Sequence, residues 1–321
     1  MTEGLRSAFQ YLFRARLVGI LAGLLALIVL FSILSGSFLS VNNLLNITRQ
    51  VSIMGILSVG MTVAIISGGI DLSVGSTIAV VGVVVAGLLV NFALPVWLVI
   101  LLGLGVGCLI GAFNGSLIAF AGVPPFIATL GTMTALRGLA YVYTGGYPIY
   151  GLPANFGWLG AGYLAGVPFP TILMFVIGAV FYIVLTKTPF GIHVYAIGEN
   201  EVAARRVGVR VIRTKLFAYV ISGALAAVSA IALAARLKAG LPTSGFTYEL
   251  TAIAAVILGG TSISGGGGSV IGTLLGALLL GVLANGLTLL NVEPYVLEVI
   301  TGAVIIVAVL VDSLRNRRLA G

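Results

Sequence analysis

Long apolar runs recur along the whole chain, and they constrain its fold more than any other feature. The hydrocarbon core of a bilayer is about 30 Å thick, so a helix needs roughly 20 predominantly apolar residues to cross it. We therefore predict an all-α polytopic membrane protein with about ten transmembrane helices. The predicted spans are 17–35, 51–68, 76–91, 96–120, 126–144, 167–186, 216–236, 251–264, 270–290 and 296–312.

The composition argues against a soluble fold. Hydrophobic residues make up 60% of the 321 residues and charged residues only 7%, whereas soluble domains carry about 25% charged residues. So few charges could not cover the surface of a water-soluble protein. The 45 glycines follow no Gly-X-Y period, which excludes collagen and suits closely packed membrane helices. We expect membrane lipids to surround the chain.

The basic residues predict how the spans are oriented. Twelve of the sixteen Lys and Arg residues lie in the N-terminus, the loop 187–215 and the C-terminus. Cytoplasmic loops are enriched in Lys and Arg, so both termini and this loop should be cytoplasmic. That orientation needs an even number of spans on each side of the loop, which agrees with six in the membrane half 1–186 and four in the membrane half 216–321. The net charge of +8 is thus a topology signal, and no nucleic acid partner is expected.

Two glycine-rich breaks interrupt apolar stretches, at 67–76 and at 258–268. Each follows an aliphatic run, so we predict a weak internal repeat. Irregular backbone at membrane depth persists only against protein or a water-filled cavity, and transporter cores are often built from such segments. Short cytoplasmic hairpin turns remain the alternative interpretation. The glycines that become candidates for a translocation pathway are Gly68, Gly69, Gly259 and Gly260.

Enzymatic signatures are missing from the sequence. There is no phosphate-binding Gly-x-x-x-x-Gly-Lys, no Gly-x-Ser-x-Gly and no His-Glu-x-x-His. The single Cys108 and the single His193 have no partner at metal-ligand spacing. We therefore predict that the chain is no enzyme and holds no metal or cofactor itself. Energy for uphill transport would come from an ion gradient or from another subunit.

The central loop specifies a short helix of its own. Asn200 is a good N-cap, Glu201 lies in the first turn, Arg205 and Arg206 approach the last turn, and Gly208 suits the C′ position. A docking surface for a cytoplasmic partner would explain why a connecting loop carries such a helix, and a solvated basic turn is the alternative. The candidate docking residues are Asn200, Glu201, Ala203, Ala204, Arg205, Arg206 and Gly208.

Asp71 and Arg137 are formal charges well inside apolar stretches. Insertion scales give a free-energy cost of about 2.5–3.5 kcal/mol for either residue at the centre of a membrane helix. Contacts with other groups should offset that cost. Arg137 could line a pathway or pair with a neighbouring helix, or it could extend toward the outer interface. Asp71 could line a pathway or cap the helix that begins near Ser73.

Amide and acidic residues elsewhere in the spans have two interpretations. Asn114, Asn285 and Glu249 could bond across helices, as polar groups in membranes usually do, or they could line the pathway. The segment 145–166 is rich in Gly, Pro and Tyr and should face outward, where it would meet a partner or cover the bundle. The full set of pathway candidates is Gly68, Gly69, Asp71, Ser73, Asn114, Arg137, Glu249, Gly259, Gly260 and Asn285.

Together these motifs resemble a known family. They match the permease subunits of bacterial ATP-binding-cassette (ABC) importers for monosaccharides of the ribose, xylose and arabinose type, with the ribose permeases nearest in pattern. The match runs in order from about residue 38 to residue 312. The matching motifs are 42–46, 59–62, 67–76, 126–130, 136–138, 142–144, 195–200, 248–254, 258–262 and 309–312.

The resemblance implies partners that the residues alone do not. It implies two permease copies, or one copy with a sister permease, on cytoplasmic ABC ATPase subunits that bind ATP and magnesium. It also implies a periplasmic or lipid-anchored sugar-binding protein and a bacterial inner-membrane location. The family's coupling helix would fall on residues 200–208. Two departures are Glu199 in place of a common glycine, and four glycines at 265–268 where ribose permeases carry a basic residue.

A secondary transporter is the competing hypothesis for function. In that case Asp71 or Glu249 would couple transport to protons, and no ATPase subunit would be needed.

Overall fold

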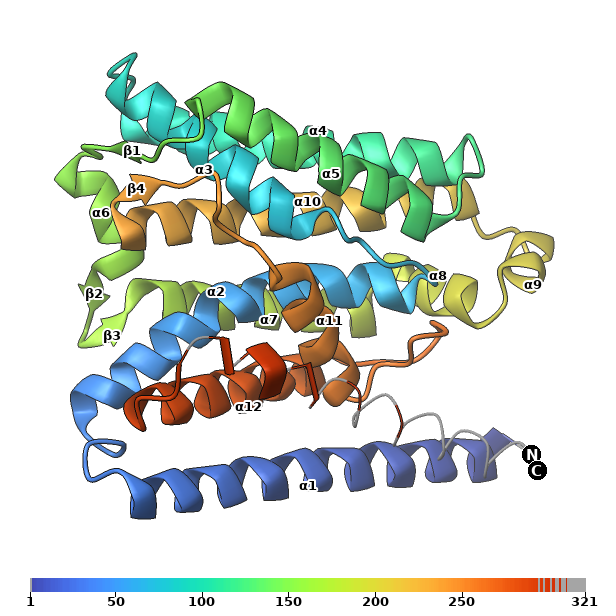
Figure 1. Cartoon of the computed structure of the whole chain (residues 1–321). Helices are drawn as coiled ribbons and strands as arrows, with labels where there is room; N and C mark the ends of the chain where they lie inside the picture. Colours follow the sequence, from blue (N-terminus) through green and yellow to red (C-terminus); the bar gives the residue numbers. More distant parts are fainter. Residues whose placement is uncertain are drawn as a thin grey trace.

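The computed structural model describes residues 2–293 and, after them, residues 295, 296, 298–300, 302, 303, 306 and 310. Most of this part of the chain is helical, and the long helices lie roughly side by side (Figure 1). The long helices are α1 (Thr2–Leu34), α2 (Val41–Ile66), α3 (Val74–Val90), α4 (Val96–Ala119), α5 (Pro125–Thr144), α7 (Phe169–Lys187), α10 (Val211–Leu237) and α12 (Val270–Leu289). The shorter ones are α6 (Ala154–Ala161), α8 (Pro189–Glu199), α9 (Glu201–Arg206) and α11 (Tyr248–Leu258).

Two pairs of very short strands lie at one end of the helix bundle, and α9 lies at the other (Figure 1). The antiparallel pairs are β1 (Ile149–Tyr150) with β4 (Ala239–Gly240), and β2 (Tyr163–Leu164) with β3 (Val167–Pro168). Helix α2 runs toward the α9 end and α10 runs away from it (Figure 1). These two long helices therefore form an antiparallel pair at the centre of the molecule.

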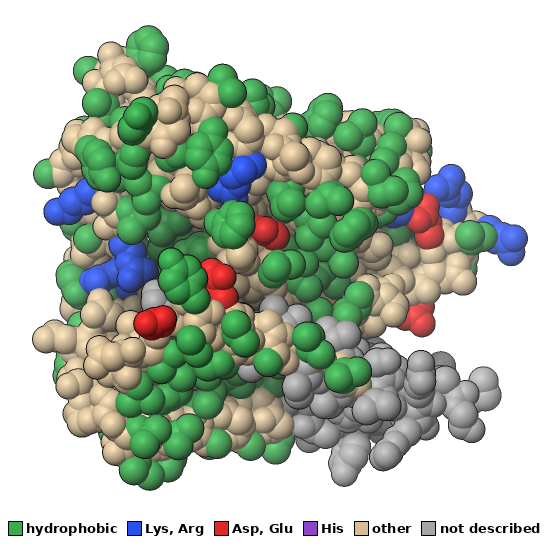
Figure 2. Space-filling model, in the orientation of Figure 1, with side chains coloured by type: hydrophobic (Ala, Val, Ile, Leu, Met, Phe, Trp, Pro, Cys, Tyr) green, Lys and Arg blue, Asp and Glu red, His purple; other side chains and the backbone are tan. Residues whose placement is uncertain are grey.

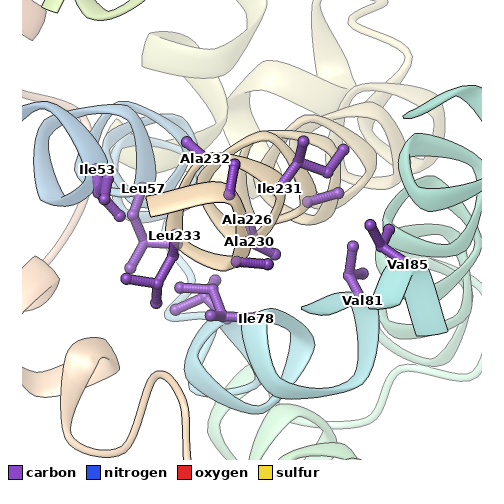
Figure 3. Close-up of a cluster of buried hydrophobic side chains, with 14 of the residues drawn as sticks. Ile53, Leu57, Ile78, Val81, Val85, Ala226, Ala230, Ile231, Ala232 and Leu233 are labelled. Atoms are coloured by element: carbon purple, nitrogen blue, oxygen red, sulfur yellow. The ribbon is translucent and has the colours of Figure 1, made fainter. Parts of the chain in front are cut away.

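The hydrophobic core lies where α10 packs against α2 and α3. The side chains labelled in Figure 3 are Ile53 and Leu57 of α2, Ile78, Val81 and Val85 of α3, and Ala226, Ala230, Ile231, Ala232 and Leu233 of α10. Alanines on α10 hold little volume, so the larger side chains of both neighbours reach close to its backbone. Close approach of helix backbones is how helices associate where lipid supplies no hydrophobic driving force.

Glycines four residues apart give α4 the same close contact with α10. A Cβ atom added at Gly107 would collide with the Gly223 carbonyl, and one added at Gly111 would collide with the Tyr219 carbonyl. Only glycine therefore permits this approach of the two helices. This packing explains part of the high glycine content.

Five helices within the described residues are long and apolar enough to cross a membrane: α2, α4, α7, α10 and α12. The apolar part of α1 from Val18 to Leu34, helix α3 and helix α11 are shorter. Of the predicted spans, 296–312 falls mainly outside the described residues, as does the basic cluster near the C-terminus. The structure is therefore that of a polytopic helical protein, while the span count and the orientation of the termini remain predictions.

The predicted boundaries of the span at 251–264 are wrong. Helix α11 has 11 residues and ends at Leu258, so at 1.5 Å per residue it is about 16 Å long and covers about half of a bilayer core. Gly259 and Gly260 end it early. Segment 241–247, which consists of turns, precedes it, so this part of the chain is half irregular.

Two other predicted boundaries also differ. Helix α2 begins at Val41 and not at residue 51, because Ser40 caps it and the polar residues of its first turns have partners. Helix α10 begins at Val211, inside the predicted loop 187–215. The basic residues of that loop's last part lie on the first turns of α10.

Candidate translocation and coupling sites

Helix α9 has the caps that the sequence predicts. The Asn200 side chain accepts a hydrogen bond from the Ala203 backbone N–H at 2.9 Å. At the other end Gly208 has φ +86°, and its N–H donates to the Arg205 carbonyl at 3.2 Å. The N-cap and the glycine C′ residue are thus confirmed. The docking role of the helix stays a prediction.

A local charge network fixes the first turn of α9 against α10. Glu201 accepts hydrogen bonds from Arg205, at 3.1 Å, and from Lys215. The hydrogen bond from Lys215 holds the pKa of Glu201 below its usual value. Glu201 thus stays ionised at neutral pH and contributes to orienting α9.

The outer face of α9 combines apolar and basic side chains. Ala204 is buried with Ile197 and Val211, whereas Val202 and Val207 are 61% and 80% exposed. Arg205, Arg206 and Ala203 are also exposed. The two valines were missed in the sequence, where they resemble ordinary helix residues. Exposed aliphatic residues ringed by arginines form a surface on which another protein can pack.

Backbone contacts join the helix that leads into α9 to both glycine-rich breaks. The Gly266 N–H donates to the Ile66 carbonyl at 3.0 Å, and a Cβ atom added at Gly198 would collide with both of these groups. The Tyr195 hydroxyl of α8 donates to the Gly268 carbonyl at 2.9 Å. We call the meeting point of residues 66–68, 195–199 and 265–268 the glycine junction. Any displacement of α8 must therefore act on both breaks.

The two breaks begin with the same local structure. Gly68 has φ +85° and its N–H donates to the Ile65 carbonyl, and Gly260 has φ +87° and its N–H donates to the Ile257 carbonyl. A second bond, from the next residue to a carbonyl five positions back, completes a Schellman motif at each helix end. The similarity of the two sequences therefore reflects a shared helix-ending signal.

The first irregular segment, 67–73, is held by Asp71. This carboxylate is 1% exposed and accepts from the Ser73 N–H at 3.0 Å, the Ser73 hydroxyl at 2.6 Å and the Ser222 hydroxyl of α10 at 2.7 Å. Asn114 of α4 donates to the Ser73 hydroxyl at 2.8 Å. The structure thus brings together three predicted pathway residues, Asp71, Ser73 and Asn114.

The second irregular segment, 241–247, is held by Arg137 of α5. Its guanidinium donates to the carbonyls of Pro242 at 3.0 Å and Ser244 at 2.8 Å, and it lies over the Phe246 ring at 5.8 Å. These contacts match the interpretation of Arg137 as a pairing residue. Unwound backbone exposes carbonyls, and a guanidinium satisfies them.

The remaining predicted pathway residues lie in helix contacts. Glu249 of α11 lies against Gly75 of α3, where any side chain would collide with its carboxylate. Asn285 of α12 exchanges two hydrogen bonds of 2.9 Å with Asn43 of α2. A Cβ atom added at Gly259 would lie 2.5 Å from the Gly272 backbone. The predicted residues therefore fall into several separate places, and their transport role stays a prediction.

One cavity in the bundle contains none of the predicted residues. Its volume is about 510 Å³, and it lies between α2, the end of α10, the start of α11, α12 and residues 298 and 302. Such a volume is in the range of small-molecule sites. Sequence reasoning missed it because its walls come from segments far apart in the chain.

Comparisons of the sequence with known proteins show what the chain is similar to. A family model described as branched-chain amino acid transport system / permease component matches residues 43–309. The chain is 48% identical over 301 residues to a ribose import permease protein of Bacillus subtilis (strain 168), covering 93% of both chains. It is 45% identical over 294 residues to the ribose import permease protein of Haemophilus influenzae, covering 90% of this chain and 91% of that one.

A xylose transport permease is also similar. The xylose transport system permease protein of Escherichia coli (strain K12) is 35% identical over 362 residues, covering 93% of this chain and 92% of that one. No solved structure matches the chain.

Proposed function

Because the chain belongs to the family of transport-system permease components, we propose that it is the membrane-spanning subunit of an ABC importer for ribose or a related pentose. The observation that carries this proposal is the match to ribose import permease proteins along more than 90% of the chain. The chain itself performs no covalent chemistry. ATP and magnesium act in partner ATPase subunits, and a periplasmic or lipid-anchored binding protein delivers the sugar.

We further propose a topology of ten spans in the bacterial inner membrane, with both termini in the cytoplasm. Segment 241–247 and α11 together form one of the spans, half irregular and half helical. This arrangement keeps an even number of spans on each side of the central loop. A second copy of the chain, or a sister permease, completes the transport pathway.

Coupling to the ATPase is assigned to α9. Its exposed Val202 and Val207 would enter a groove on the ATPase, while Arg205 and Arg206 pair with acidic residues at the rim. The glycine junction then carries a displacement of α9 to both breaks through α8. The contacts among Ile66, Gly198 and Gly266 are made by backbone atoms, so no flexible side chain absorbs the movement there. The Tyr195 hydroxyl adds a side-chain contact to Gly268.

Reversing the basic pair tests this assignment. In vesicles that contain the chain, its ATPase and its binding protein, the double variant Arg205→Glu with Arg206→Glu should lose ATP-dependent uptake of radiolabelled ribose and retain less ATPase on purification. A docking loss of about 1.4 kcal/mol or more lowers affinity at least about tenfold. Arg210→Glu, an exposed change in the same loop outside α9, is the control.

Unchanged uptake in the double variant would refute the docking role. Vesicles with the chain alone test the competing hypothesis. Ribose accumulation driven by an ion gradient, without ATPase subunits, would show a secondary transporter.

A further inference from the structure

The 510 Å³ cavity has a mostly apolar lining into which several polar side chains are set. Its walls carry the side chains of Gln50, Arg236, Tyr248, Thr251 and Glu298. The basic residue is unexpected, because Arg236 is one of only four Lys and Arg residues outside the three basic clusters of the sequence. It lies one residue before the end of α10, in the half of the molecule opposite α9 (Figure 1).

Most of these polar groups are not used by the protein. Within the described residues, the side chains of Gln50, Arg236, Tyr248 and Glu298 form no hydrogen bond or ion pair. Arg236 and Glu298 have opposite charges and line the same cavity, but they do not meet. Of these four residues, Arg236 and Tyr248 are partly buried, whereas Gln50 and Glu298 are exposed. Partly buried polar groups in a membrane protein normally pair with one another unless they serve a ligand or a water-filled path.

The composition of the lining selects a class of ligand. Arg236 can only donate hydrogen bonds and an ionised Glu298 can only accept them, whereas each hydroxyl of a sugar does both. One acid and one base line the cavity, so an anion such as a sugar phosphate would find a partner in Arg236 but lie close to the acidic Glu298. The rings of Phe246 and Tyr248 give apolar faces of the kind that fix ligand orientation. A neutral polyol uses all of these features.

The place in the fold also suits a transported molecule. The start of α11 lines the cavity directly after the irregular segment 241–247. In transporters, substrate sites are built where a discontinuous helix begins, near the middle of the bilayer. Figure 2 shows Lys, Arg, Asp and Glu side chains gathered on this half of the molecule, apart from those of the α9 region.

We propose that this cavity is a binding site for a monosaccharide inside the permease chain, occupied between release from the binding protein and arrival in the cytoplasm. The inference deepens the proposed import of a pentose and rests on it. Arg236 and Glu298 hold hydroxyl groups from opposite walls, Gln50 contacts a third hydroxyl, and Tyr248 covers a face of the sugar ring.

Cysteine protection tests the site directly. In the complete transporter in vesicles, Cys108 is replaced by Ser and Gln50 by Cys, and labelling by a water-soluble maleimide is followed with increasing ribose. We expect the cysteine to be labelled, and ribose at about ten times its dissociation constant to slow labelling about tenfold by mass action. Ribose 5-phosphate at equal concentration should protect less. Val142→Cys, exposed on α5, should be labelled equally with or without ribose.

A second measurement separates this proposal from the proposed function. Arg236→Met should lower sugar uptake per ATP hydrolysed, while stimulation of the ATPase by the loaded binding protein persists. If the parent transporter itself takes up no ribose, the proposed function fails. If the parent imports ribose but the Gln50→Cys variant resists labelling, or is labelled without protection by ribose, the cavity is no sugar site. Labelling blocked only by lipid would identify it as a lipid site.

Discussion

The two irregular segments that follow the central helices are held in opposite ways. Segment 67–73, after α2, is stabilised by its own Asp71, and five of its seven residues are buried. Segment 241–247, after α10 and β4, has two buried residues and depends on Arg137 from α5. The first segment supplies the acidic group that holds it, and Ser222 of α10 and Thr129 of α5 donate hydrogen bonds to it. The second segment is held by a basic group that belongs to another helix.

This difference separates a rigid region from an adjustable one. The first segment belongs to the α9 half, where the glycine junction ties it to α8. The second borders the cavity, and movement of α5 would release two of its carbonyls, compared with one, that of Ile70, in the first segment. A permease needs both properties, because a rigid connection transmits movement and an adjustable wall lets a substrate enter and leave.

Removing Asp71 should have the largest effect. Asp71→Ala deletes the acceptor of three hydrogen bonds and leaves the buried donors of Ser73 and Ser222 unpaired. Hydrogen bonds to charged groups contribute about 1.5–3 kcal/mol each, and they are not additive, so we expect a loss of at least about 3 kcal/mol. Thermal unfolding of the purified chain in detergent measures it.

Asp71→Asn is the matched control, because the amide oxygen still accepts. It should recover a large part of the stability of the parent chain. A neutral effect of Asp71→Ala would show that Asp71 does not hold the first segment, and the contrast between the two segments would then fail.

Removing Arg137 should destabilise the chain less than removing Asp71 does, and the effect should be confined to the second segment. Arg137→Met keeps much of the side-chain volume but loses the bonds to the Pro242 and Ser244 carbonyls, a cost of about 1–3 kcal/mol. Hydrogen exchange followed by mass spectrometry should show faster exchange of amides in 241–247 and unchanged exchange in 67–73. Arg137→Lys, which can keep one bond, should fall between. Equally faster amide exchange in both segments would contradict the difference proposed between them.

Local signals in the sequence predicted the parts that depend on neighbouring residues. Asn200 and Gly208 cap α9 as expected, because a cap needs only the side chain and the backbone a few residues away. The Gly-Gly pairs also mark where α2 and α11 end. The error at 251–264 arose because the predicted span was extended into the predicted break at 258–268, where Gly259 and Gly260 end the helix.

Contacts between distant segments could not be predicted in this way. Asp71 was recognised as a buried charge, but its partner Ser222 lies 151 positions away. The carbonyls that Arg137 satisfies belong to Pro242 and Ser244, and nothing near residue 137 identifies them. The cavity could not be predicted for the same reason, because its walls meet only after α2, α10, α11 and α12 have packed.

The smallest predicted effect sharpens the comparison at a single glycine. Gly68 has φ +85°, and a Cβ atom added there would lie 3.8 Å from the nearest neighbouring atom, so Gly68→Ala should cost only the left-handed backbone strain of about 1–2 kcal/mol. Gly122, with φ +70° and open space around it, is the matched control, and the midpoint of thermal unfolding should shift equally for both variants.

Gly245 also has a positive φ, but its added Cβ atom would collide with the Gly75 carbonyl. If Gly245→Ala nevertheless costs no more than Gly68→Ala, the second segment yields freely to the collision, as an adjustable wall should. A larger cost would show that it is as rigid as the first.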